Sequence, residues 1–76
     1  MKEVLEYVAR NLVDDPEAVE VTAVEGERSM ILQLRVAPDD MGKVIGKGGR
    51  TARAIRSVVR AAGTRQGVST LVEIVE

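Results

Sequence analysis

A short glycine-rich stretch in the second half of the chain restricts the fold more than any other feature. Three glycines and one lysine occupy positions 46–49, directly after the apolar pair Val44 and Ile45 and directly before a segment with helical periodicity. Glycine permits positive φ and close backbone approach, so such a loop can place its N–H groups against a phosphate. The N-terminus of the following helix points partial positive charge at the same anion. The stretch predicts a turn between two helices that can hold phosphate.

Charge is distributed unevenly along the 76 residues, although the formal net charge is only -1. Residues 1–40 are predominantly acidic, whereas residues 41–67 contain no acidic residue. The basic residues of this second block are Lys43, Lys47, Arg50, Arg53, Arg56, Arg60 and Arg65. A basic block confined to the glycine loop and the helix after it favours a polyanionic ligand over a single phosphate.

The composition argues against several classes of function. Without cysteine or histidine, the chain lacks a thiol nucleophile, the commonest general base and the commonest metal ligand. Four aspartates near prolines could offer oxygen ligands, but such pairs are typical of turns and helix caps: Asp14, Asp15, Asp39 and Asp40. No apolar run approaches a membrane span, and the N-terminus does not begin a signal peptide. We expect a cytoplasmic protein that is not an enzyme and has no cofactor, metal or membrane contact.

Hydrophobic periodicity predicts the element order α-β-β-α-α-β. The predicted helices cover residues 2–13, residues 41–45 and about twelve residues after the glycine loop; the predicted strands cover residues 19–24, 30–37 and 69–75, with a turn at 25–29 and a loop at 64–67. Asp39 or Asp40 is expected to cap the short helix, and Gly63 to end the long one in the C′ position. A crossover of two helices between the last two strands predicts an α+β fold, with a three-stranded sheet and helices packed on one face.

The glycine spacing excludes two nucleotide-cofactor loops. A triphosphate-binding loop follows G-x-x-x-x-G-K-[ST], but only three residues separate Gly42 from Gly46, and Gly48 stands where the hydroxyl residue belongs. A dinucleotide fingerprint follows G-x-G-x-x-G, but Thr51 occupies the third glycine position and no βαβ unit precedes it. A helix-loop-helix in which I-G-x-x-G turns the chain fits the spacing.

This arrangement resembles the KH domain, whose GXXG loop clamps the backbone of about four nucleotides. The resemblance rests on residues 44–49 and on Ile55, the buried helix residue expected six positions after the second motif glycine. The element order is similar to the type II form. The resemblance covers essentially the whole chain, so residues 1–76 are expected to form a single type II KH domain with its GXXG loop at 46–49. This format is similar to the small stand-alone bacterial RNA-binding proteins of the KhpA family.

The resemblance to the KhpA family implies a role and partners. It implies a bacterial RNA chaperone or post-transcriptional regulator that binds single-stranded RNA with low sequence specificity. It also implies pairing with a second KH-containing protein and a link to cell-envelope and cell-length control, and hence to cell shape. We therefore expect single-stranded RNA as ligand and either a homodimer or a heterodimer with another KH-containing protein.

The expected RNA contacts come from the loop and its two flanking helices. They are Lys43, Ile45, Gly46, Lys47, Gly48, Gly49, Arg50, Arg53 and Arg56. On a helical wheel the arginines at 50, 53, 56 and 60 fall within an arc of roughly 120°. Because like charges at these spacings cost about 0.2–0.5 kcal/mol a pair, the arc favours an anionic ligand.

Apolar contacts and base stacking are expected to add little specificity. Ile45 is expected to form the floor of a groove together with Ile31 or Leu34 of the second strand. Tyr7 is the only aromatic residue, which disfavours modules that stack bases on aromatic platforms. The main alternative is a protein-interaction subunit in which the KH fold serves mainly for homo- or heterodimerisation, because small domains often gain burial by association.

Overall fold

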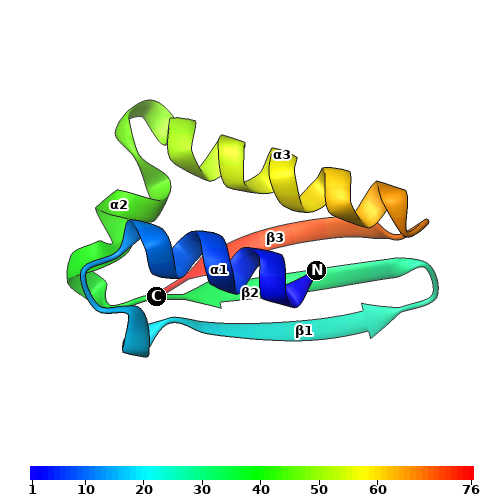
Figure 1. The fold of residues 1–76 in the computed structure, drawn as a ribbon, viewed down its shortest axis with the longest axis horizontal. Helices are drawn as coiled ribbons and strands as arrows, with labels where there is room; N and C mark the ends of the chain where they lie inside the picture. The colour runs from blue at the N-terminus through cyan, green and yellow to red at the C-terminus, as the bar shows by residue number, and fades with distance from the viewer.

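Three helices lie over a three-stranded sheet in the computed structural model, which describes residues 1–76 (Figure 1). The helices and strands are α1 (Lys2–Leu12), β1 (Glu20–Gly26), β2 (Ser29–Arg35), α2 (Met41–Ile45), α3 (Arg50–Arg65) and β3 (Ser69–Val75). Short 3-10 turns at Pro16–Ala18, Pro38–Asp40 and Lys47–Gly49 join them. The predicted order α-β-β-α-α-β is confirmed. None of the helices has the length and apolar run needed to cross a bilayer.

The sheet has the strand order β1-β2-β3 and is mixed. The first two strands form an antiparallel hairpin in which Gly26 pairs with Ser29 around a two-residue turn, and Arg28 takes a positive φ of 54°. The predicted turn at 25–29 was therefore too long, and β1 continues two residues beyond its predicted end. Strand β3 runs parallel to β2, from Ser29 opposite Ser69 to Arg35 opposite Val75. The helical crossover predicted between these strands supplies that parallel connection.

The core forms where the helices meet the inner face of the sheet. Leu5 and Ala9 of α1 and Leu32 and Leu34 of β2 are completely buried, as is Val59 of α3. The predicted alternation along β2 is thus confirmed, because every second side chain points to the helices. Burial ends before the last turn of α1, where Leu12 is exposed.

The end of α3 differs from the prediction. The helix does not stop at Gly63 but continues to Arg65, and Gly67 instead takes the positive φ of 71° that follows a helix end. The N–H of Val68 donates to the carbonyl of Gly63 at 2.8 Å, and the N–H of Gly67 donates to that of Thr64 at 3.0 Å. These two bonds are the Schellman pattern, shifted by one turn from its predicted place.

Gly63 is needed for close packing rather than for its backbone angle. A Cβ atom at Gly63 would lie 2.1 Å from Oγ1 of Thr70, 2.8 Å from the carbonyl oxygen of Val68 and 3.0 Å from Sδ of Met1. Because Gly63 has no side chain, the backbone of α3 can approach the side chain of Thr70 at the start of β3. The sequence analysis was right to single out the glycine at position 63, but this glycine is needed for packing and not for ending the helix.

A buried carboxylate holds α2 against the segment that follows α1. Asp40 is only 3% exposed, and its two carboxylate oxygens accept the N–H groups of Asp14 at 3.2 Å and Asp15 at 3.1 Å. Asp40 occupies the N-cap position of α2 but makes no side-chain cap bond there, so the predicted capping role is wrong. Its carboxylate instead fixes the point from which α2 leads into the glycine loop.

Substitution of the two helical glycines should separate packing from helix propensity. We expect Gly63→Ala to lower the free energy of unfolding by about 1–3 kcal/mol, because the added Cβ overlaps Thr70 and Val68. Gly42 of α2 has nothing within 4 Å of its Cβ direction, so Gly42→Ala should raise that free energy by about 0.5–1 kcal/mol. Urea unfolding measures both; equal effects would contradict the packing role.

Removal of the Asp40 carboxylate should destabilise the fold. Asp40→Ala leaves the N–H groups of Asp14 and Asp15 without their acceptor, and we expect a loss of about 2–3 kcal/mol in the free energy of unfolding. The matched control is Asp39→Ala, because this neighbour is exposed and its loss should cost no more than about 0.5 kcal/mol. If urea unfolding gave the same result for both variants, the carboxylate would not be an anchor.

Candidate functional site

The glycine loop turns the chain between α2 and α3 with backbone angles that favour glycine. Gly46 has φ 74° and ψ 169°, a combination that is essentially restricted to glycine. Gly48 and Gly49 follow with φ of 67° and 76° in the left-handed region. The prediction that this stretch is a tight turn between two helices is confirmed. Lys47 is the only residue of the loop with a side chain, and it is exposed.

The loop is packed against α3 on one side and open on the other. A Cβ atom at Gly46 would lie 2.2 Å from Oγ1 of Thr51, so the first turn of α3 rests directly on this glycine. At Gly48 and Gly49 a Cβ atom would meet nothing within 4 Å. The hydrogen bonds that close the loop use the N–H groups of Gly46, Gly49 and Arg50. The N–H groups of Lys47 and Gly48 take no part in closing it, and the backbone there is exposed to an approaching ligand.

The cations beside the loop have no acidic partner. Lys47 and the arginines of α3 form no ion pair, since the ion pairs of the structure involve only the N-terminus, Arg10 and Lys43. Arg53 reaches back and donates from Nη2 to the carbonyl of Gly48 at 3.2 Å, which places its guanidinium beside the loop. Lys47, Arg50 and Arg53 are exposed and lie at or just before the N-terminal end of α3; these three residues are hereafter the loop patch.

Two predicted contact residues are engaged elsewhere. Lys43 forms an ion pair with Asp14 and lies 3.9 Å from Oδ1 of Asp40. The hydrogen bond to Asp14 raises the pKa of Lys43 above its ordinary value, but the same carboxylates neutralise its charge. Arg56 donates from Nε to the carbonyl of Val72 on β3 at 3.3 Å and is partly buried. The structure therefore separates these two residues from the loop patch.

Of the residues predicted to form an apolar groove floor, only Ile45 lies where it can contact a ligand beside the loop. Ile45 is 39% exposed at the end of α2, beside the loop. Leu34 is completely buried in the core, and Ile31 points to the sheet face that the helices leave uncovered. Leu34 therefore has no surface to offer to a groove, and Ile31 lies on the opposite face of the sheet from the helices, because strand residues alternate between the two faces.

Sequence reasoning missed two features of the site. One is the Asp40 anchor, which was interpreted as a cap because an aspartate at the start of a helix usually serves that purpose. The other is the bond from Arg56 to Val72, which joins two elements whose relative position no local pattern gives. For Lys43 a signal was present: Asp40 lies three residues earlier, at a helical pairing distance.

The sequence resembles a known family along almost its whole length. The family model described as KhpA/KhpB, KH domain, matches residues 2–74. RNA-binding protein KhpA of Clostridium acetobutylicum is 55% identical over 75 residues, which cover 99% of this chain and 100% of that protein. The protein of the same name from Clostridium perfringens is 56% identical over 75 residues, which again cover 99% of this chain and 100% of that protein. That from Aquifex aeolicus is 45% identical over 76 residues, covering 100% of this chain and 96% of its own length.

A solved structure has the same fold. A crystal structure of a variant of Era from Aquifex aeolicus, bound to GDP and aluminium fluoride, superposes with a TM-score of 0.64 at 19% identity. The match covers 97% of this chain but only 30% of Era, so the likeness concerns the fold alone. The mixed sheet and the element order are those of the type II KH fold, as predicted. By the family-model match and the identities to its relatives, the chain belongs to the KhpA/KhpB KH-domain family.

Proposed function

We propose that the chain binds single-stranded RNA with low sequence specificity through the glycine loop and the loop patch. The observation that carries this proposal is the turn at 46–49, whose three positive-φ glycines leave the N–H groups of Lys47 and Gly48 free beside unpaired cations. The relatives named RNA-binding protein KhpA support RNA as the polyanion. In this proposal residues 1–76 act as one KH domain.

In this proposal the backbone and the side chains of the site make different contacts with the RNA phosphates. The N–H groups of Lys47 and Gly48 approach a phosphate, and the Lys47 ammonium adds a mobile charge to it. Arg50 and Arg53 present planar guanidinium groups that can bind the next phosphate with two hydrogen bonds each. Contacts of this kind fix the position of the strand but do not distinguish bases. Since the chain offers one aromatic residue, Tyr7 on α1, stacking adds little, and sequence preference is weak.

This mode of binding fits a chaperone or post-transcriptional regulator in the cytoplasm better than an enzyme. A single backbone clamp without stacking releases RNA readily, which lets one protein act on many transcripts. The family model is that of a KH domain, and the relatives are named RNA-binding proteins. We therefore assign Lys47, Gly48, Arg50 and Arg53 to ligand binding and no residue to catalysis.

Reversal of charge in the loop should abolish binding. We expect Lys47→Asp combined with Gly48→Asp to weaken affinity for a single-stranded RNA at least about 100-fold, because two charge-assisted contacts are replaced by repulsion. Fluorescence anisotropy with a labelled oligoribonucleotide measures the loss. Because aspartate tolerates the left-handed backbone angles of Gly48, the melting temperature of this variant should fall by no more than about 8 °C.

The matched control replaces the same two residues by asparagine. Lys47→Asn with Gly48→Asn has the same shape and the same backbone demands but brings no negative charge. Its melting temperature should equal that of the aspartate variant, but its affinity for RNA should fall only about tenfold. Full affinity in the aspartate variant would refute the loop as the binding element, and equal losses in the two variants would refute the electrostatic part of the mechanism.

We propose association through the uncovered sheet face as a second function. The observation that favours it is a row of three paired apolar residues across that face: Val24, Ile31 and Leu71 are 53%, 37% and 50% exposed. Exposed apolar rows of this kind mark interaction surfaces. A second copy or another KH-containing protein would cover this row and leave the loop free for RNA.

Sedimentation velocity should detect this association. We expect the protein to sediment as a dimer and Leu71→Lys to sediment as a monomer, since a lysine in the row would have to be buried without a partner. Val58→Lys is the matched control, because Val58 is also 50% exposed but lies on α3. A monomeric wild type, or a dimer that only the Val58 variant dissociates, would overturn the assignment to the sheet face.

A further inference from the structure

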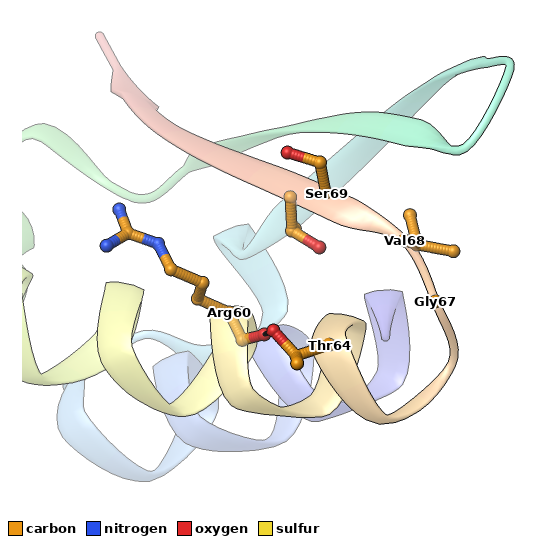
Figure 2. Close-up of a pocket in the computed structure, with 6 residues that line it drawn as sticks. Arg60, Thr64, Gly67, Val68 and Ser69 are labelled. Atoms are coloured by element: carbon orange, nitrogen blue, oxygen red, sulfur yellow. Dashed lines mark hydrogen bonds between the residues drawn. The ribbon is translucent and has the colours of Figure 1, made fainter.

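A polar pocket lies between the last turns of α3 and the start of β3, at the opposite end of the helix from the glycine loop. Its volume is about 370 Å³. Figure 2 shows Arg60 and Thr64 on the helix, Gly67 and Val68 in the connection and Ser69 on β3; the Arg60 side chain lies between helix and strand, with its guanidinium directed away from the connection. Thr70, which α3 approaches closely at Gly63, also lines the pocket.

The wall that β3 contributes is a free sheet edge. Strand β3 pairs only with β2, so every second residue of β3 directs its N–H and C=O groups away from the sheet. Because Arg56 binds the carbonyl of Val72, the outward set is Thr70, Val72 and Ile74. The N–H and C=O of Thr70 therefore face the pocket, beside the hydroxyl of Thr64, which donates to the carbonyl of Arg60 at 3.0 Å and keeps its acceptor lone pairs free. The pocket is thus lined by a backbone donor, several acceptors and one cation.

A protein strand is a poor occupant of this edge. Pairing with an added strand needs several consecutive free groups, but Arg56 already occupies the carbonyl of Val72 in the middle of β3. The fully free outward residues, Thr70 and Ile74, lie on either side of that carbonyl, and neither stretch is long enough for a stable ladder. The guanidinium of Arg60, which has no acidic partner, favours an anion instead.

We propose that this pocket binds a further nucleotide of the same RNA strand that the glycine loop holds. The inference rests on the proposed function, because the strand must first be bound at the loop patch. Arg50 and Arg60 are ten residues apart on one helix, so their Cα atoms are about 15 Å apart. A strand that leaves the loop along α3 passes Arg53 and Arg56 and arrives at Arg60. The footprint of the protein then exceeds the four nucleotides that a GXXG loop clamps.

The end of α3 sets how the nucleotide lies in the pocket. A helix C-terminus carries partial negative charge and disfavours phosphate. The phosphate therefore lies against Arg60, one turn before Thr64, and the sugar and base lie toward the helix end. Hydroxyl or amino donors of the nucleotide meet the hydroxyl oxygen of Thr64 and the outward carbonyl of Thr70 there. The carbonyls of Gly63 and Thr64 are already satisfied by Val68 and Gly67, so they do not compete.

The test compares oligouridylates of four and ten nucleotides on the full chain. We expect Arg60→Ala to weaken binding of the decanucleotide about tenfold, the loss of one charge-assisted contact, and to leave the tetranucleotide unchanged. Arg65→Ala is the matched control, since it removes the same charge from the same helix but from outside the pocket. Thr64→Leu fills the pocket without changing charge and should act like Arg60→Ala.

Amide resonances provide an independent measurement. In ¹⁵N–¹H correlation spectra, the signals of Gly67 and Ser69 should shift with the decanucleotide and stay in place with the tetranucleotide. Equal losses in the Arg60 and Arg65 variants, full affinity in the Thr64 variant, or unshifted amides would each overturn the pocket assignment. Retained tetranucleotide binding by the aspartate loop variant would instead refute the proposed function, so the two failures are distinguishable.

Discussion

The parallel pairing of β2 with β3 determines where every part of the site lies. Parallel neighbours cannot be joined by a tight turn, so the chain must leave the end of β2, cross the sheet and return to its starting end. The crossover consists of α2, the glycine loop and α3, and it lies on the one face that the helices cover (Figure 1). The loop therefore comes at the end of the sheet where β2 finishes. The long helix then runs back along β3, which brings its C-terminal end to Ser69.

Two short-range contacts fix this crossover at its ends. At the first, Asp40 accepts two N–H groups from the segment after α1, which sets the start of α2 and hence the position of the loop. At the second, Gly63 lets α3 touch Thr70. Between them, Val44, Ile55 and Val59 bury the crossover against the sheet. The exposed glycine backbone at 46–49 thus joins two helices that are each held by the core, and binding there does not require the fold to rearrange.

The sequence was sufficient for the element order and for the turn, but not for contacts between distant elements. The predicted bounds of β3 and α2 match the observed ones, because a strand that follows a loop and a short helix between turn signals are marked by local residue types. The prediction misplaced the end of α3, since a glycine kept for packing against Thr70 looks the same as a glycine at a helix end. It also counted Lys43 and Arg56 among the free cations. Their partners, Asp14 and the carbonyl of Val72, come from segments that only the tertiary fold brings near.

Because of these contacts, the arginines of α3 do not form one continuous basic face. As a continuous row of arginines the face would repel itself along its whole length, at about 0.2–0.5 kcal/mol for each neighbouring pair. Arg56 is drawn toward β3 by the carbonyl of Val72, which divides the row into the loop patch and Arg60. Arg53 is held beside the loop by the carbonyl of Gly48. Positive charge is therefore gathered at two separate places on one rigid helix, and two fixed points favour a flexible polyanion that spans both over a compact anion that reaches only one.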